Sequence, residues 1–209
     1  QINRSEAAIS TDVDVVIVGA GPGGATCALA LSHYCASSGA GVKSVLLLDK
    51  HSRRRSRSNT VLLDLAPSSA LENLGCDISA FSPASDWTQI CPEEAVLNQY
   101  PLPDYKRRRG AGLTYSALFM LRRTPVFNVG INMLEESLYR RIEEKEEVTL
   151  KHHAELTEIL SCEDGSCLVR FVAHGAPHEV RTRFVIAADG TNSATLQALG
   201  VGEKRGVRQ

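Results

Sequence analysis

A glycine-rich turn, GAGPGGA, constrains the fold of this chain more than any other feature of its sequence. The turn follows residues 14–18, an apolar and β-branched run that is typical of a strand buried on both faces of a parallel sheet. Small and apolar residues then continue over residues 23–34 and suit a helix packed closely on that sheet. Strand, turn and helix in this order predict the first part of a doubly wound α/β sheet.

Three glycines of the turn, Gly19, Gly21 and Gly24, have the GxGxxG spacing. Gly19 permits the tight turn, Gly21 lets a pyrophosphate approach the backbone, and Gly24 lets the helix sit close to the strand. The helix start adds N–H groups and the positive end of its dipole. Asp49 ends the next predicted strand, where a carboxylate accepts hydrogen bonds from ribose hydroxyls and disfavours a 2′-phosphate. This context predicts a dinucleotide site rather than only a glycine-rich turn, but it does not distinguish NAD from FAD.

Further strand and helix patterns complete the predicted sheet. Residues 45–48 predict its second strand, residues 132–147 an amphipathic helix, and residues 148–151 another strand. Three runs separated by turn-rich stretches then predict a β-meander, and a last apolar run ends at Asp189 and Gly190; the runs are 156–160, 168–173, 179–183 and 184–188. Weaker patterns indicate strands at 60–65, 114–121 and 125–129 and a helix at 67–74. The predicted fold class is therefore α/β.

The motif VIAADGTNS, in which a buried strand ends at Asp189 and Gly190, resembles the second flavin-contacting motif of the para-hydroxybenzoate hydroxylase-like flavoproteins. The combination of GAGPGGA, VLLLDK and this motif, with a meander before the last, covers nearly the whole chain. The resemblance implies a Rossmann-like FAD-binding fold, a doubly wound sheet with a β-meander, plus part of a second β layer. It also implies that the cofactor is FAD and that Asp189 meets the ribityl chain or the nearby ribose.

Within that superfamily, the chain is more similar to the MICAL monooxygenase branch. The segments SRSNTVLLDLAPSSALENLG, FNVGINMLEESLYRRI and ADGTNSATLQALG carry this likeness. It implies that Arg57 and Asn59 lie nearest the flavin. From the residues alone, a flavin or phosphate contact and a solvated basic loop are equally supported for Arg57, whereas a solvated loop is favoured for residues 53–55.

The residues expected to bind the cofactor belong to the glycine turn, the end of the second strand, the basic loop and the last motif. They are Gly19, Gly21, Pro22, Gly23, Gly24, Asp49, Lys50, Arg57, Asn59, Asp189 and Gly190. No catalytic residue and no metal site are predicted, because no Ser/His/Asp order or metal-ligand spacing stands out. Residues 1–209 are expected to form one FAD-binding domain, with a dinucleotide-binding core at 13–75 and 131–200 and an inserted, partial substrate-side region at 76–130.

The resemblance implies an FAD-dependent monooxygenase that uses NAD(P)H as a transient electron donor and hydroxylates an unidentified small-molecule or protein substrate. One alternative is an FAD-dependent reductase or dehydrogenase of the geranylgeranyl reductase-like type, although the Cys-Gly-rich stretch of those enzymes does not follow VLLLDK here. Another alternative is a non-catalytic flavin-binding module. The family's later Gly-Asp segment is not in this sequence, so the chain is expected to be an N-terminal part completed by a C-terminal segment or a second chain.

Composition limits the partners and the compartment. Lys and Arg total 23 against 24 Asp and Glu, and this balance gives no reason to expect nucleic acid or an acidic membrane as a partner. The 6 cysteines lack a CxxC spacing and are expected to be reduced thiols. The first residues lack the apolar core of a signal peptide, and no apolar stretch approaches the roughly 20 residues of a membrane span. A cytoplasmic protein without stable membrane insertion is therefore expected.

Overall fold

The computed structural model describes residues 12–38, 42–53, 60–63, 65–78, 81–83 and 127–200. The chain divides into two compact units, of which the first contains residues 1–57 and 134–209 and the second contains residues 58–133. Residues 58–75, expected in the dinucleotide-binding core, thus fall in the second unit. The substrate-side role expected for residues 76–130 stays a prediction.

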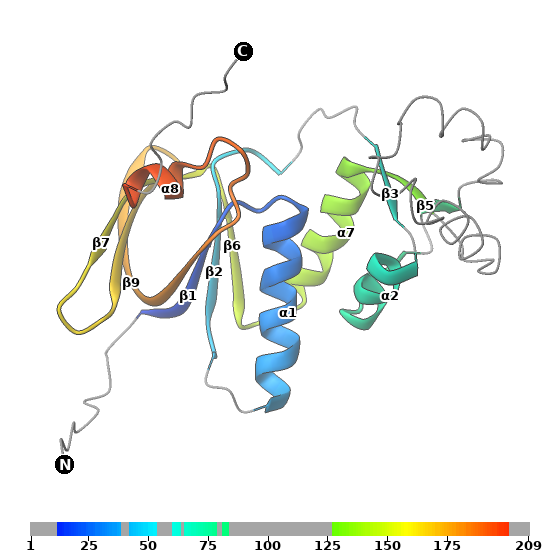
Figure 1. Ribbon diagram of the computed structural model, residues 1–209, viewed down its shortest axis with the longest axis horizontal. Helices are drawn as coiled ribbons and strands as arrows, with labels where there is room; N and C mark the ends of the chain where they lie inside the picture. The colour runs from blue at the N-terminus through cyan, green and yellow to red at the C-terminus, as the bar shows by residue number, and fades with distance from the viewer. Residues whose placement is uncertain are drawn as a thin grey trace, which may run out of the picture. The chain divides into compact units, whose positions relative to one another are not determined.

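The first unit is built on a six-stranded sheet with the strand order β6-β2-β1-β9-β8-β7 (Figure 1). Its parallel part consists of β1 (Val13–Val18), β2 (Val45–Asp49), β6 (Val148–His152) and the end of β9 (Ala176–Ala187). The strand β1 lies between β2 and β9, with Val16 opposite both Leu46 and Val185. The carboxyl ends of β1, β2 and β9 therefore meet at one edge of the sheet.

The predicted meander is formed by β7 (Ala154–Ser161), β8 (Cys167–Ala173) and β9, which pair antiparallel. The two separate strands predicted at 179–183 and 184–188 are wrong, because β9 is continuous from Ala176 to Ala187. Its first half pairs with β8 and its second half with β1. The pattern of polar and apolar residues along β9 changes where its pairing partner changes from β8 to β1, although the backbone of β9 does not turn there.

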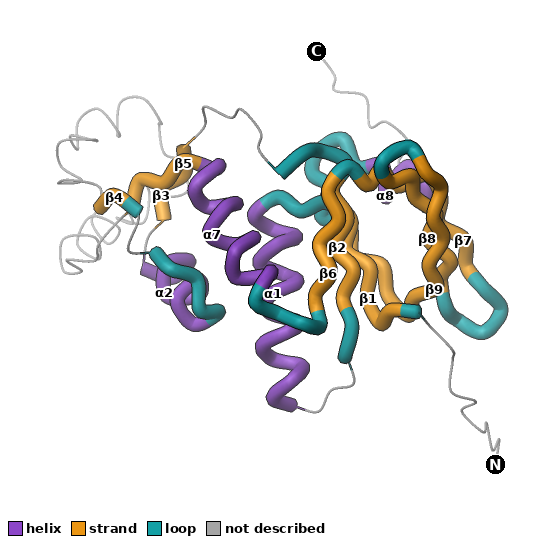
Figure 2. The backbone as a smooth tube through the Cα atoms, turned by 180° about the vertical axis from the view of Figure 1, so that it is seen from behind, coloured by secondary structure: helices purple, strands orange, loops and turns teal. Residues whose placement is uncertain are grey.

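The two faces of the parallel strands are covered differently. Val16, Val18, Leu46 and Leu48 pack in one buried cluster with residues of the meander. The alternate residues of β1 and β2 point to the opposite face, where the helix α1 (Pro22–Ser38) contacts β1, β2 and β6. Figure 2 shows the meander strands β7–β9 curling away from the side on which α1 and α7 lie. The α/β expectation is confirmed, with a meander rather than helices on the second face.

The helix α7 (Ile131–Glu143) buries the face predicted from its sequence. Leu134, Leu138 and Ile142 are buried along it. The helix was expected to run to residue 147, but it ends at Glu143 because residues 144–147 turn the chain into β6. In this turn the carbonyl of Glu147 accepts the N–H of Val45 at 2.8 Å.

Burial at the end of β9 differs from the expectation of a strand covered on both faces. Phe184 is 54% exposed, with the guanidinium carbon of Arg183 at 5.5 Å from its ring centroid. The apolar composition of residues 184–188 thus predicted the strand correctly but overestimated its burial. Among the described helices, none is long and apolar enough to cross a bilayer.

The second unit contains a small antiparallel sheet and one helix in its described part. The strands β3 (Thr60–Leu63), β5 (Phe127–Gly130) and β4 (Ser82–Pro83) pair in that order. The helix α2 (Leu65–Asn73) begins two residues before the predicted one. This unit supplies the expected second β layer, and the strand predicted at 114–121 lies outside the described residues.

Candidate dinucleotide-binding site

A cavity of about 310 Å³ opens at the carboxyl edge of the parallel strands. Its lining comes from four segments of the first unit, which lie within residues 18–23, 48–51, 154–156 and 188–194. The strand order changes direction around β1, because β2 follows it on one side and the distant β9 lies on the other. Ligands of open α/β sheets bind at such a switch point, outside the carboxyl ends of the strands.

The glycine turn closes tightly against the end of β9. Gly19 has a φ of 99°, a conformation that L side chains rarely adopt. Its N–H donates to the carbonyl of Leu48 at 2.7 Å. A Cβ at Gly24 would lie 1.9 Å from the carbonyl oxygen of Gly19, so no side chain fits between the helix start and the turn. The two glycines therefore set the position of α1 against the strands.

The opposite side of the turn faces the cavity. Gly21 and Gly23 line it, and apart from chain neighbours and the backbone of the same helix, no described heavy atom lies within 4 Å of a Cβ built at either position. The helix α1 begins at Pro22, and its first turn contains no acidic side chain. Because the first N–H groups of a helix have no partner inside the helix, this end of α1 suits a phosphate.

Asp49 links the end of β2 to the glycine turn. Its side chain is buried, its Oδ1 accepts the N–H of His51 at 2.8 Å, and its Oδ2 accepts the N–H of Ala20 at 3.2 Å. Each carboxylate oxygen has lone pairs for a further donor. Asp49 thus holds the turn and also lines the cavity.

Sequence reasoning missed Tyr139, which contacts the same turn from α7. Its hydroxyl donates to the carbonyl of Ala20 at 2.7 Å, and its side chain is buried. Its ring meets His152 edge-on, with the ring centroids 5.2 Å apart. A buried tyrosine hydroxyl generally has a hydrogen-bond partner, but nothing in the sequence indicates that the partner is 119 positions away.

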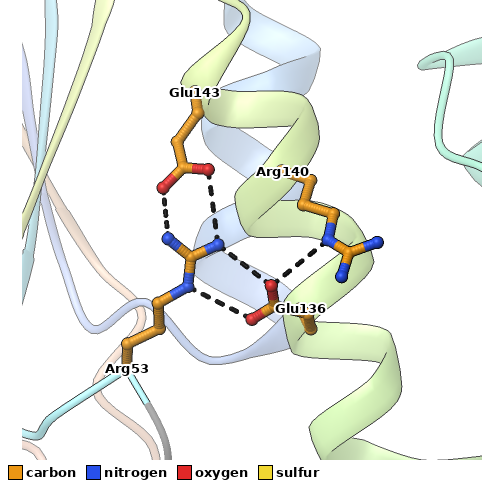
Figure 3. A network of polar contacts seen from close by, with 4 residues as sticks. All are labelled: Arg53, Glu136, Arg140 and Glu143. Atoms are coloured by element: carbon orange, nitrogen blue, oxygen red, sulfur yellow. Dashed lines mark hydrogen bonds and ion pairs between the residues drawn. The ribbon is translucent and has the colours of Figure 1, made fainter.

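Arg53 follows β2 and is bound to α7 (Figure 3). It pairs with Glu143, and its Nε and Nη2 each lie 3.1 Å from an oxygen of Glu136, which also contacts Arg140. The hydrogen bond with Arg53 lowers the pKa of Glu136. The guanidinium also lies 6.0 Å from the ring centroid of Tyr139. Arg53, whose side chain is 34% exposed, therefore joins the chain after β2 to α7 through surface ion pairs and does not line the cavity.

Asp189 organises the loop that follows β9. Its Oδ1 accepts the hydroxyl of Ser193 at 2.6 Å, and its Oδ2 accepts the N–H of Thr195 at 2.9 Å. Ser193 in turn caps the short helix α8 (Ala194–Ala198) through the N–H of Leu196. Burial alone would raise the pKa of Asp189, but the hydrogen bonds from Ser193 and Thr195 outweigh it and lower the pKa overall. The ionised carboxylate is thus the form that this loop stabilises.

The structure brings most of the sequence-predicted site residues to one place. The cavity is lined by Gly19, Gly21, Pro22, Gly23, Asp49, Lys50, Asp189 and Gly190. Gly24 lies behind the turn against Gly19, whereas Arg57 and Asn59 lie outside the described residues. Sequence reasoning missed residues 154–156 in the lining. Their alternating pattern indicates only a strand, and the sheet topology alone brings them to the cavity.

Two further features bear on the chemistry of this region. A second, more open hollow of about 410 Å³ adjoins the cavity at Lys50 and Glu155 and is also lined by His153 and His174, but the glycine turn does not line it. Within the described ranges, no group of three or more His, Cys, Asp or Glu side chains could hold a metal ion. The cavity at the glycine turn is therefore the better candidate site.

Comparison with known proteins agrees with this geometry. A family model described as an FAD binding domain matches residues 12–208. Comparison with curated proteins gives no match. Two similar solved structures are the p-nitrophenol 4-monooxygenase PnpA from Pseudomonas putida DLL-E4, at 19% identity and a TM-score of 0.60, and the flavin-dependent monooxygenase PieE in complex with FAD and substrate, at 22% and 0.64. A third is aklavinone-11 hydroxylase in complex with FAD and aklavinone, at 16% and 0.64.

These similarities cover most of this chain but a minor part of the others. The alignments cover 92%, 91% and 92% of this chain and 44%, 33% and 35% of the three proteins, in the order given. The chain therefore spans less than half the length of these structural relatives. At such identities the likeness shows a shared fold.

Proposed function

The chain belongs to the FAD binding domain family, and on that premise we propose that it is the cofactor-binding part of an NAD(P)H-using flavoprotein monooxygenase. The observation that carries the proposal is the cavity where the glycine turn, Asp49 and the Asp189 loop meet. Its volume of about 310 Å³ is in the range of small-molecule sites. The similar solved structures include a p-nitrophenol 4-monooxygenase, aklavinone-11 hydroxylase and an aromatic hydroxylase from angucycline biosynthesis. We therefore propose an aromatic substrate.

The residues present fit the ADP part of FAD. Gly21 and Gly23, on either side of Pro22 at the start of α1, suit the pyrophosphate, because both offer backbone without an intervening side chain. Asp49 suits the adenosine ribose, and its negative charge would repel a 2′-phosphate there. Gly190 and Asn192 line the side of the cavity that the Asp189 loop forms. We expect the ribityl chain on that side.

The cofactor and the protein would contribute different parts of the reaction. Bound FAD supplies hydride acceptance from NAD(P)H and the reaction with oxygen. The protein binds and orients the cofactor through backbone N–H groups and the carboxylate of Asp49. Because Asp49 is buried with both oxygens held by N–H groups, this part of the site is formed in advance of the ligand.

Several parts of the proposal concern the whole protein. Since the chain spans 33–44% of the length of the structural relatives named above, we propose that substrate binding needs further protein, either in the same polypeptide or in a second chain. Among the described residues, Cys27, Cys162 and Cys167 form no disulfide, which supports the proposal of a reducing, cytoplasmic compartment.

The experiment begins with the purified chain, which is incubated with FAD, separated from free cofactor and examined by visible absorption. NADPH or NADH is then added without oxygen, and air containing isotopically labelled oxygen is admitted with p-nitrophenol as the probe. Retained flavin, its bleaching by the nicotinamide and label in the aromatic product support the monooxygenase. Bleaching with only hydrogen peroxide as product supports the flavin and nicotinamide steps and is the result expected when the part of the protein that binds the substrate is absent. Retained flavin without bleaching favours the binding module, and no retained flavin contradicts the proposed site.

A further inference from the structure

Two side chains from distant elements hold the peptide groups on either side of Ala20. The N–H of Ala20 donates to Oδ2 of Asp49 at 3.2 Å, and its carbonyl accepts the hydroxyl of Tyr139 at 2.7 Å. Ala20 itself is fully buried between Gly19 and Gly21. The middle residue of the glycine turn is therefore tied to the end of β2 and to α7 at the same time.

These two bonds fix two successive peptide planes, because each peptide group is planar and trans. The bond to Asp49 fixes the plane that joins Gly19 and Ala20. The bond to Tyr139 fixes the next plane, which contains the Ala20 carbonyl and the Gly21 N–H. In a trans peptide these two groups point in opposite directions, so the Gly21 N–H points away from Tyr139. Gly21 also lines the cavity.

The hydroxyl of Tyr139 is itself held in place. The side chain is 1% exposed, and Leu138 and Ile142 of the same helix are also buried. His152 meets the ring edge-on, and Arg53 lies over it. Arg53 in turn forms ion pairs with Glu136 and Glu143 (Figure 3). The ring is therefore contacted by β6 and by the segment after β2, and its hydroxyl has little freedom to move.

We propose that Tyr139 is a positioning residue for dinucleotide binding. Its hydroxyl orients the Gly21 N–H toward the place of the cofactor pyrophosphate before the cofactor binds. This inference rests on the proposed function, because it takes FAD as the ligand of the cavity. Tyr139 acts through the Ala20 peptide and needs no contact with the cofactor. A merely structural tyrosine would stabilise the fold without changing the affinity of the folded protein for FAD.

The test compares Tyr139→Phe, which removes only the hydroxyl, with Tyr34→Phe as a matched control. Tyr34 lies on α1 and is 57% exposed. Amide hydrogen exchange of the peptide that covers residues 19–25 is measured in the full chain without FAD, and FAD affinity is measured separately by flavin fluorescence. Loss of a buried hydrogen bond corresponds to roughly tenfold in an equilibrium constant. We expect exchange about tenfold faster in that peptide and FAD affinity about tenfold weaker for Tyr139→Phe, with Tyr34→Phe like the wild type.

Each possible result of these measurements either supports or contradicts the positioning role of Tyr139. Unchanged exchange in residues 19–25, or faster exchange spread equally over the whole chain, overturns the positioning role. Unchanged FAD affinity in a folded Tyr139→Phe also overturns it. The wild type gives a test that needs no variant, since the hydrogen-bonded amides of the turn, those of Gly19, Ala20 and Ala25, must be protected from exchange without FAD, and their lack of protection contradicts the proposal. If the wild type is protected but binds no FAD, the proposed function fails while the exchange data still decide the orientation of the turn.

Discussion

The carboxylate of Asp49 accepts the backbone N–H of Ala20 at 3.2 Å and so joins the end of β2 to the glycine turn. The same carboxylate accepts the N–H of His51 at 2.8 Å through its other oxygen. One buried side chain therefore shapes the turn and the segment after β2 and lines the cavity between them. A change at Asp49 must affect both the fold and the ligand.

Asp49→Asn tests this double role. An amide keeps one acceptor oxygen but turns an NH₂ group toward the second N–H donor, so one buried hydrogen bond is lost. We expect the free energy of unfolding to fall by about 1–3 kcal/mol and FAD binding to weaken roughly tenfold or more. Urea unfolding and a fluorescence titration with FAD measure the two effects.

Asp14→Asn is the matched control for Asp49→Asn. Asp14 lies at the opposite end of β1, where its Oδ2 accepts the N–H groups of Lys43 and Ser44 at 2.7 and 3.1 Å. Its replacement should lower stability and leave FAD affinity unchanged. An equal loss of FAD affinity in both variants would mean that Asp49 acts only through the fold.

Gly24→Ala should damage the fold itself. The added Cβ would lie 1.9 Å from the carbonyl oxygen of Gly19, and a backbone atom cannot move aside as a flexible side chain can. We expect a loss of about 2–4 kcal/mol in the free energy of unfolding. Gly23→Ala, with no described heavy atom within 4 Å of its Cβ, should change stability by no more than about 1 kcal/mol. Thermal unfolding of the two variants measures the contrast, and similar midpoints would contradict it.

Gly21→Ala should separate ligand binding from folding. The described residues leave the space at this position open, and Gly21 lines the cavity. A methyl group there meets no described atom of the protein but occupies the path by which a pyrophosphate approaches the backbone. Stability should stay within about 0.5 kcal/mol of the wild type, whereas FAD affinity should fall at least about tenfold. An unchanged dissociation constant for FAD would place the pyrophosphate elsewhere.

Local patterns explain how much of the fold could be predicted from the sequence. The strand β1, the glycine turn and α1 follow one another without interruption, so composition and spacing suffice to place them. Asp49 was assigned to the cavity for the same reason, since it ends a strand that is parallel to β1. The face of α7 was read from the spacing of Leu134, Leu138 and Ile142.

Relationships between distant segments could not be predicted in this way. The strand β9 pairs with β8 before Thr182 and with β1 after it. The side-chain environment changes at this point, so the sequence pattern predicted two strands where there is one. The bond from Tyr139 to Ala20 joins residues 119 positions apart, and an inward tyrosine on a helix has no local signal for its partner. Phe184 is exposed although the residues that follow it, 185–188, are apolar. Each of these depends on which elements pack together, and a single sequence does not state this.

The ion pairs of Arg53 should contribute little to stability, because they are half-exposed (Figure 3). Glu136 contacts both Arg53 and Arg140, whereas Glu143 contacts Arg53. We expect Glu136→Gln to cost more than Glu143→Gln, with both below about 1 kcal/mol in low salt. Screening should abolish the difference at about 1 M salt, where the Debye length is about 3 Å. Urea unfolding at both salt concentrations checks this, and a large difference that survives high salt would contradict it.

Asp189 should make the stability of the protein depend on pH in the acidic range, through the loop after β9. Burial alone would raise the pKa of Asp189, but the bonds from Ser193 and Thr195 lower it overall. A carboxyl whose pKa is lower in the folded state stabilises the fold above its unfolded pKa, which is about 3.9, and this contribution disappears as the pH falls through the folded pKa. The wild type should therefore lose stability below about pH 4, and Asp189→Asn should lose less over that range. Urea midpoints from neutral to acid pH measure the two slopes, with Glu163→Gln, in the exposed turn before β8, as the control. Parallel slopes for the wild type and Asp189→Asn would show that Asp189 does not contribute to the acid sensitivity.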